Sequence, residues 1–227
     1  MTGPVPAALI LAGGDLDHPG AQAHLFTGPW NIVVAVDRGA AHARRLGLKP
    51  SVLVGDMDSI DPGDRRALQP VPEVVYPAAK DKSDTQLAVE WALHRGARRI
   101  VIAGGIGNRF DHSLANAHLL LTIERHGAAG VVTDGRQALY LLSHRLRLKA
   151  PAGHVLSVLP LGPDCRGLSE RGLRWELEDH DPVLGNTLTL SNEFLGRPAE
   201  LRLRHGFALV VTGPPDGPAG ERAASAG

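Results

Sequence analysis

The sequence lacks what several classes of protein require. Its 227 residues include one cysteine, Cys165, so the chain can form no internal disulfide and no zinc-type cysteine pair. Apolar runs are short: the run at residues 8–13 is too short for a membrane span or a signal peptide, and no basic segment precedes it. We therefore expect a cytoplasmic protein without a membrane partner.

A net charge is also absent, because 24 Lys and Arg residues balance 24 Asp and Glu residues. This balance argues against broad electrostatic binding to nucleic acid, although it leaves room for a local basic patch around a phosphate. The hydrophobic share of 43% and the charged share of 21% are close to those of ordinary soluble proteins. The length suits one large domain or two small ones.

The first part of the chain repeats a short apolar run that ends in Gly or Asp. The predicted strands are residues 8–13, 32–37, 52–56, 100–105 and 130–134, with a shorter candidate at 74–76. Helices are predicted at residues 40–46, 85–94 and 113–126. Continuous β-branched runs suit strands that are covered on both faces, and their alternation with helices predicts an open, mostly parallel α/β sheet.

The pattern changes near residue 136, where strands and turns replace helices. Residues 188–190 and 201–204 alternate with a period of two, and residues 207–211 are predicted to form a final strand. We predict an α/β domain over residues 1–135 and a smaller all-β, sandwich-like domain over residues 136–212. The Gly-, Pro- and Ala-rich residues 213–227 are predicted to form a flexible tail.

Aspartates gather where the predicted strands end. Asp37 ends one strand, Asp56 and Asp58 follow the next within GDMDS, and Asp84 and Asp111 lie in later loops. The carboxyl ends of parallel strands share one edge of a sheet, where ligands bind. Clustered carboxylates repel each other unless a cation lies between them, and Mg²⁺ takes carboxylate and phosphate oxygens. The sequence therefore predicts a site for Mg²⁺ and a polyphosphate.

Cations and glycines stand in the same loops. Lys80 and Arg109 are suited to bind phosphate oxygens, and Gly105 and Gly107 would let the backbone approach a phosphate closely. Each aspartate taken singly is explained better as a helix cap, but capping requires neither two acids in one turn nor an arginine two residues before Asp111.

Two common nucleotide motifs are missing. The chain has no GxxxxGK[ST], so it is not a P-loop protein. Phe110 stands where GxGxxG would need its third glycine, which argues against a nicotinamide dehydrogenase.

Several motifs occur together in a fixed order: GDMDS, KDKSDT, GGIGNRFDH followed by LAN, GLRWEL and SNEF. From Leu9 to about Val211 the chain resembles the thiamine pyrophosphokinase family. The resemblance implies transfer of pyrophosphate from ATP to the hydroxyethyl group of thiamine with the help of Mg²⁺. It also implies an N-terminal domain for ATP and metal, a β domain for thiamine, and a homodimer with thiamine sites near the subunit interface.

The resemblance also assigns residues to roles. It implies metal binding by Asp56, Asp58 and Asp84, catalysis by Asp84, Arg109 and Asp111, and thiamine binding by Trp175, Ser191 and Asn192. The residues that we predict to bind ATP or its phosphates are Asp37, Lys80, Gly105, Gly107 and Arg109. Trp175 would stack on the pyrimidine. Either Asp84 or Asp111 would orient the hydroxyl or accept its proton, and the sequence leaves this open.

The sequence departs from the family at a few positions, and it also leaves two alternative functions open. Met57, Arg38 and Ser83 stand where Phe, Gly and Thr are common, but none of these changes removes a carboxylate. The alternatives are a pyrophosphokinase acting on a hydroxymethylpterin and a non-catalytic protein that binds a nucleotide or thiamine.

Overall fold

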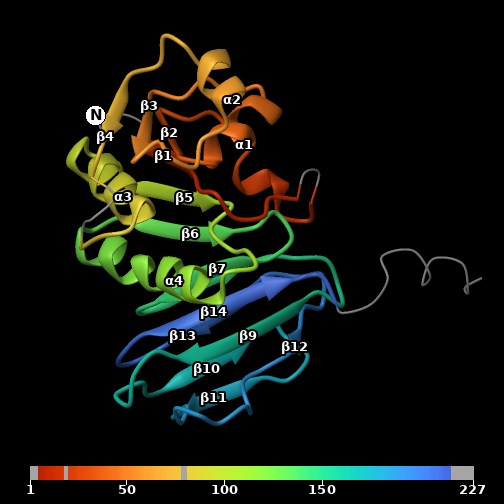
Figure 1. Ribbon diagram of the computed structural model, residues 1–227. Helices are drawn as coiled ribbons and strands as arrows, with labels where there is room; N and C mark the ends of the chain where they lie inside the picture. The colour runs from red at the N-terminus through yellow and green to blue at the C-terminus, as the bar shows by residue number, and fades with distance from the viewer. Residues whose placement is uncertain (1–4, 18–19, 78–80, 216–227) are drawn as a thin grey trace, which may run out of the picture.

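The computed structural model describes residues 5–17, 20–77 and 81–215, and its main feature is a ten-stranded sheet (Figure 1). Across the sheet the strands are β12 (Asn192–Glu193), β9 (Val155–Pro160), β14 (Ala208–Gly213), β7 (Ala138–Leu142), β6 (Ala129–Thr133), β5 (Arg99–Ala103), β1 (Ala7–Leu11), β2 (Ile32–Val36), β3 (Val52–Gly55) and β4 (Glu73–Val75). The six strands β1 to β6 are parallel to one another. Strands β7, β14, β9 and β12 are each antiparallel to their neighbours. The predicted mixed α/β class is confirmed.

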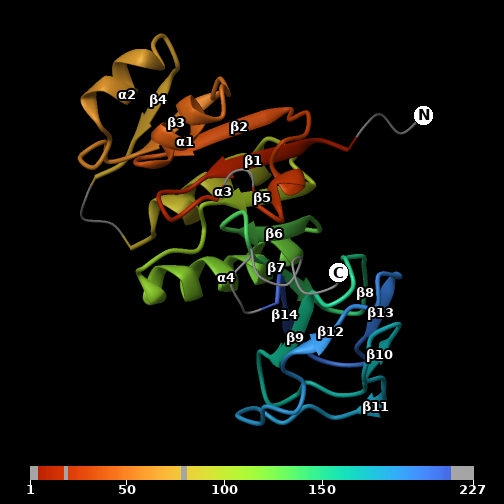
Figure 2. The same cartoon turned by 90° about the vertical axis from the view of Figure 1, so that its right-hand side faces the viewer.

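Helices cover both faces of the parallel half (Figures 1 and 2). One face carries the short 3₁₀ helix η1 (Ala23–Leu25), α1 (Gly39–Arg45) and α2 (Pro62–Ala67), and the other carries α3 (Asp84–His94) and α4 (Phe110–Arg125). Ile10 of β1 packs in the core with α3 and α4, while its neighbours Leu9 and Leu11 pack in the core with α1. Burial on both faces is the reason why these strands are continuously apolar. Within the described residues, no helix is both long enough and apolar enough to cross a membrane.

A second sheet packs on the antiparallel half of the first. It has four strands in the order β11 (Leu177–His180), β10 (Leu168–Arg171), β13 (Ala199–Arg202) and β8 (Arg145–Leu148). Leu142 and Leu156 of the large sheet share a core with Leu168 and Leu201 of the small sheet, and Phe194 fills it. The lower part of the molecule in Figure 2 is therefore a two-layered β structure.

The predicted division at residues 135 and 136 falls between β6 and β7, which are paired strands of one sheet. The parallel and antiparallel halves are thus joined by continuous backbone hydrogen bonding. Strand β14 extends to Gly213, so the first residue of the predicted tail belongs to the sheet. Residues 216–227 of that tail lie outside the described residues.

The predicted strand at residues 188–190 is wrong, because this segment forms turns. Its alternation is real but inverted. Leu188 and Leu190 are exposed, whereas Thr189 is buried and its hydroxyl donates a hydrogen bond to the Val158 carbonyl at 2.6 Å. The alternation of leucine and threonine in the sequence is the same whether the leucines face the core, as in the predicted strand, or the threonine does, as in this turn.

Candidate active site

A cavity of about 310 Å³, here called the central cavity, opens at the carboxyl ends of β1, β2 and β5. The strand order reverses beside β1, and crevices at such points are where open α/β sheets bind ligands. Of the predicted site residues, the cavity brings together Asp37, Asp84, Gly105, Gly107 and Arg109. One acid from β2, one from the start of α3 and one arginine from the loop after β5 therefore face the same space.

The GDMDS turn after β3 is built around the Asp37 carboxylate. Gly55 has φ of 151°, and a Cβ at this position would lie 1.8 Å from Asp37 Oδ1, so only glycine leaves room for that carboxylate. The Met57 N–H donates to Asp37 Oδ1 at 3.3 Å, and the Asp58 N–H donates to Asp56 Oδ1 at 3.1 Å. Two predicted carboxylates thus lie in the turn and a third, that of Asp37, is hydrogen-bonded to it, although Asp56 and Asp58 do not line the central cavity itself.

The acids suit Mg²⁺ by their chemistry, since they offer hard carboxylate oxygens. Within residues 5–17, 20–77 and 81–215, no three His, Cys, Asp or Glu side chains are close enough together to enclose a metal ion. Asp56, Asp58 and Asp84 are therefore not gathered into a closed protein cage. The seating of Asp37 against Gly55 nevertheless holds carboxylates at one turn, which fits an ion that takes one or two carboxylates and completes its shell with phosphate oxygens.

Arg109 and Asp111 form a two-point ion pair. Arg109 Nε donates to Asp111 Oδ1 at 2.9 Å, and Nη2 donates to Oδ2 at 2.6 Å. These hydrogen bonds lower the pKa of Asp111 far below its ordinary value. Arg109 lines the central cavity, whereas Asp111 does not line it and contacts the arginine instead.

Helix α4 fixes the glycine loop that precedes it. The Asn116 amide donates to the Gly105 carbonyl at 2.8 Å, and Ser113 Oγ accepts the Gly107 N–H at 3.0 Å. Asn116 is buried and both side chains line the cavity. The sequence motifs assign these two residues no role, although Asn116 stands in the LAN segment that follows the arginine motif. Gly105 is tightly packed, because a Cβ there would lie 2.5 Å from Val132 Cγ1.

In the β part, Asn192 holds the backbone of Trp175. Asn192 Oδ1 accepts the Trp175 N–H at 3.1 Å, and its Nδ2 donates to the Trp175 carbonyl at 2.6 Å and to Glu170 Oε2 at 2.7 Å. Asn192 is buried, so its amide is directed to these partners, and its predicted contact with thiamine has no support from this geometry. Glu170 was missed by sequence reasoning, and no motif marks it. Burial raises the pKa of this carboxyl to about 7.

The ring of Trp175 is displayed at the surface. It is 53% exposed, and the Arg174 guanidinium lies over it, 4.9 Å from the ring centroid. Arg174 Nη1 is held by Glu193 Oε2 at 2.8 Å. Ser191 is also exposed, with φ of 58°, and its N–H donates to Ser157 Oγ at 3.0 Å.

The predicted thiamine residues are not part of the space that contains the acids. The residues that line the central cavity do not include Trp175, Ser191 or Asn192. The predicted phosphate ligand Lys80 lies outside the described residues. The single cysteine, Cys165, is buried in the β core, where burial raises the pKa of its thiol to about 11.

Comparison with known proteins gives consistent matches along the chain. Residues 25–132 match the family described as thiamin pyrophosphokinase, catalytic domain, and residues 143–207 match thiamin pyrophosphokinase, vitamin B1 binding domain. Thiamine pyrophosphokinase of Bacillus subtilis is 27% identical over 197 residues, covering 82% of this chain and 89% of that protein.

Solved structures give the same result. The crystal structure of thiamine pyrophosphokinase from Bacillus subtilis has a TM-score of 0.82 at 25% identity and covers 92% of this chain and 99% of its own. Thiamin pyrophosphokinase from Candida albicans has a TM-score of 0.75 at 13% identity, covering 92% of this chain and 89% of its own, which shows a shared fold alone.

Proposed function

The chain belongs to the thiamine pyrophosphokinase family, and from this premise we propose that it is an enzyme that transfers the pyrophosphoryl group of ATP to thiamine. The observation that carries the proposal is the convergence of Asp37, Asp84 and Arg109 on the central cavity, beside the GDMDS turn. In the reaction the hydroxyethyl oxygen attacks the β-phosphorus. The bond from that phosphorus to the oxygen that bridges it to the α-phosphorus breaks, and AMP leaves.

The side chains mainly position the reactants and neutralise charge, as in other phosphoryl transfers. Arg109, oriented by Asp111, binds phosphate oxygens with its guanidinium. Asp84 lines the cavity and is suited to accept or orient the hydroxyl proton of thiamine. Asp111 is a poorer proton acceptor, because its pairing with Arg109 lowers its pKa.

Mg²⁺ is the proposed ion, and Asp56, Asp58 and Asp84 would hold it. When bound, the ion would neutralise negative charge on the polyphosphate. The support is the donor set, which consists of carboxylates held at one turn by Gly55 and Asp37.

Trp175 is the proposed platform for the thiamine ring system, with Ser191 beside it. The Arg174 guanidinium covers the ring and places a positive charge over it. This charge disfavours stacking of the cationic thiazolium and favours the uncharged aminopyrimidine. Asn192 holds the backbone of Trp175, and Glu170 accepts a hydrogen bond from the same Asn192 amide.

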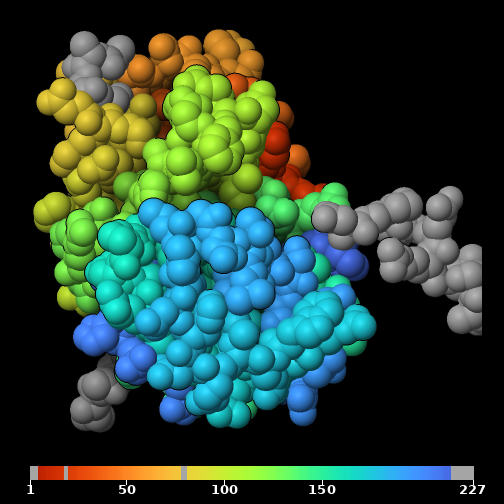
Figure 3. Space-filling model, turned by 90° about the horizontal axis from the view of Figure 1, so that it is seen from below, coloured from red at the N-terminus to blue at the C-terminus, as the bar shows by residue number. Residues whose placement is uncertain are grey.

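A homodimer is proposed because Trp175 and the central cavity are separate in one chain. The segment that follows Trp175 exposes an unusual number of large apolar side chains, and clustered apolar exposure marks binding surfaces. They are Val183, Leu184, Leu188, Leu190 and Leu195. Figure 3 shows this segment, in light blue, spread over the face of the β part. A second copy would cover it and bring a Trp175 to the acids of the first. A cytoplasmic location also stays a proposal.

Thiamine is favoured over a pterin because residues 143–207 match a vitamin B1 binding domain. The test is incubation of the purified protein with ATP and either thiamine or the hydroxymethylpterin, with and without Mg²⁺, followed by chromatography of the nucleotides. We expect AMP only when thiamine and Mg²⁺ are both present. AMP formed with the pterin alone would establish the alternative enzyme. Thermal stabilisation by thiamine without AMP release would indicate a binding protein.

A further inference from the structure

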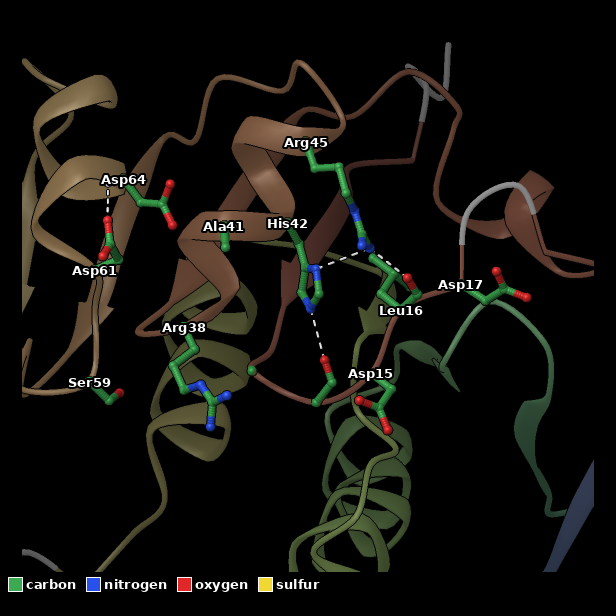
Figure 4. A pocket seen from close by; sticks show the side chains of 12 residues that line it. Asp15, Leu16, Asp17, Arg38, Ala41, His42, Arg45, Ser59, Asp61 and Asp64 are labelled. Carbon is green, nitrogen blue, oxygen red and sulfur yellow. Dashed lines mark hydrogen bonds between the residues drawn. The ribbon is translucent and has the colours of Figure 1, made fainter.

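His42 and Asn192 each hold a neighbouring loop by its backbone, and each has a second residue behind it. In the parallel half, His42 Nε2 donates to the Gly14 carbonyl at 2.8 Å, and Arg45 Nη2 lies 3.3 Å from His42 Nδ1 (Figure 4). Because an arginine can only donate, this contact makes Nδ1 the acceptor and leaves the proton on Nε2. The second residue therefore determines how the first one binds the loop.

In the β part, the loop that joins β10 to β11 carries Trp175 and is anchored in the same way. Asn192 holds both backbone groups of Trp175, since its Oδ1 accepts the N–H and its Nδ2 donates to the carbonyl. An amide turned the other way would place a donor against the N–H and an acceptor against the carbonyl. The Arg174 N–H adds a hydrogen bond to the Glu193 carbonyl at 2.9 Å. The position of Trp175 therefore depends on the orientation of one side-chain amide.

Glu170 is the residue behind Asn192, and it sets the orientation of that amide. Its Oε2 accepts the second Nδ2 hydrogen of Asn192 at 2.7 Å. Because a carboxyl oxygen accepts hydrogen bonds, the amide presents Nδ2 to Glu170 and Oδ1 to the Trp175 N–H. Glu170 belongs to β10 of the small sheet and Asn192 to β12 of the large sheet, so this contact joins the two layers next to the Trp175 loop.

The fold itself gains little from a carboxyl at this position. Glu170 is 1% exposed, and Leu177 and Leu201 flank it on the adjacent strands. Its second oxygen, Oε1, has no hydrogen-bond partner among the residues that the structure describes. Burying a carboxyl with one oxygen unpaired costs free energy, and the same burial raises its pKa to about 7. A leucine would suit this core better, so the contribution of the carboxyl lies in its contact with Asn192.

The ring of Trp175 relies on this backbone anchor, because the core does not enclose it. The ring is 53% exposed, and the Arg174 guanidinium lies over it. A side chain that must be ordered when the ligand arrives loses conformational freedom, and this loss weakens binding. A ring whose backbone is already held at both its N–H and its carbonyl avoids part of that cost.

We propose that Glu170 is a positioning residue for thiamine, which acts through the Asn192 amide to hold the Trp175 ring in place for the substrate. The inference rests on the proposed function, because it takes Trp175 as the platform for thiamine. Glu170 is buried and does not line the central cavity, so it touches neither substrate. Its loss changes the affinity for thiamine and leaves the chemical step and the ATP site unaltered.

The first test replaces Glu170 with leucine, which removes the acceptor and fills the space with an apolar side chain. Glu170→Leu should raise the KM for thiamine about tenfold, because the Asn192 amide loses the contact that orients it. The KM for ATP and kcat should stay within about twofold of their wild-type values. The midpoint of urea unfolding at pH 8 should be unchanged or higher, since a buried carboxyl has been removed. A merely structural role would lower the midpoint instead.

Two further variants separate the acceptor from the packing. Glu170→Gln is the rescue variant, because its side-chain carbonyl can accept the same Nδ2 hydrogen, and its KM for thiamine should stay close to that of the wild-type protein. Leu168→Val is the matched control, since Leu168 lies two residues earlier on β10 and is fully buried in the same core. It should lower the urea midpoint slightly without changing the KM for thiamine.

The second test observes the Trp175 backbone directly and needs no substrate. Labelling with ¹⁵N-tryptophan gives three backbone amide signals, from Trp30, Trp91 and Trp175, and the spectrum of Trp175→Phe identifies the last of them. In Glu170→Leu the Trp175 amide should exchange with deuterium about tenfold faster than in the wild-type protein, because its acceptor is no longer held. The signals of Trp30 and Trp91 should not change, and Glu170→Gln should exchange like the wild-type protein.

The results separate this inference from the proposed function. An unchanged KM for thiamine in Glu170→Leu overturns the inference, and so does an equal rise in Leu168→Val, which would trace the effect to packing. Unaltered exchange of the Trp175 amide in Glu170→Leu overturns it as well. A wild-type protein that forms no AMP from ATP and thiamine would contradict the proposed reaction, while the exchange measurement would still decide whether Glu170 positions Trp175.

Discussion

Asp111 lies two residues after Arg109, and this spacing lets the guanidinium bind the carboxylate through two hydrogen bonds. The pairing lowers the pKa of Asp111 and directs its oxygens toward the arginine. Asp84 lines the central cavity and Asp111 does not, and for this reason we propose Asp84 as the acid that meets the hydroxyl of thiamine. The sequence offers both acids as the group that orients the hydroxyl or accepts its proton, and the contacts of their side chains distinguish the two.

A single carboxylate of the GDMDS turn should decide the reaction rate. Asp58 is exposed, so Asp58→Asn should leave the fold intact while it removes a charge from the proposed metal site. We expect kcat to fall by about a hundredfold or more, as is typical when electrostatic stabilisation of the transition state is lost. The measurement is AMP formation at saturating ATP and thiamine. Asp164→Asn, an exposed acid of the β part, is the control. Wild-type turnover by Asp58→Asn would remove this residue from the site.

Glu170 should make the stability of the protein depend on pH. Burial raises its pKa to about 7 from an ordinary value of 4.5, so between these values the folded chain binds a proton that the unfolded chain releases. The free energy of unfolding therefore falls as the pH rises through this window, by roughly 2–3 kcal/mol from this group. Glu170→Gln has no such proton to lose.

Urea unfolding at pH 5 and pH 8 tests this expectation. The wild-type protein should lose roughly 2–3 kcal/mol more of its stability between the two values than Glu170→Gln, since all other groups are the same in both proteins. Equal pH dependence of the two proteins would show that Glu170 is ionised in the folded chain and that its carboxyl does not carry the expected proton.

At the scale of elements, helix α1 depends on a close approach to strand β1. A Cβ on Gly39 would lie 1.9 Å from the Leu11 carbonyl oxygen, so this helix begins on a glycine because no larger residue fits. Gly39→Ala should lower the free energy of unfolding by about 1–3 kcal/mol through overpacking. Gly28→Ala is the matched control, because nothing lies within 4 Å of the added Cβ. If the two variants unfold at the same urea concentration, the helix can shift without cost.

The elements that the sequence predicts best are those whose burial is complete. Each predicted strand of the parallel half exists within a few residues. In β1, β2, β3 and β5, helices on both faces make the strands almost continuously apolar. The short helix α2 and the turn at residues 188–190 are not anticipated. Six residues give little helical periodicity, and Thr189 is buried through a hydrogen bond to the Val158 carbonyl that no pattern reveals.

In the site, too, the sequence predicts some residues and not others. Acids at strand ends are predictable, because parallel strands bring their carboxyl ends to one edge. The roles of Asn192 and Glu170 are not, because they depend on contacts between strands far apart in the chain. Arg38 appears in the sequence only as a departure from a family pattern, and its place in the lining of the central cavity becomes visible in three dimensions.

At the scale of the whole molecule, the site is expected to need two chains. Trp175→Ala should raise the KM for thiamine, and Asp58→Asn should abolish turnover, so each variant alone is impaired. If the acids of one copy act with Trp175 of another, subunits mixed after mild dissociation should regain activity, to about a quarter of the wild-type level. Absence of any gain in the mixture, with mixed dimers shown to be present, would place both residues in sites of a single chain.

In the proposed reaction this chain moves two phosphoryl groups together from ATP to thiamine. The most direct measurement uses ATP labelled in its β-phosphate, with thiamine and Mg²⁺, and separates all products. We expect the label to appear in thiamine pyrophosphate, in an amount equal to the AMP released. Release of ADP, or label recovered in inorganic phosphate while thiamine stays unmodified, would contradict it.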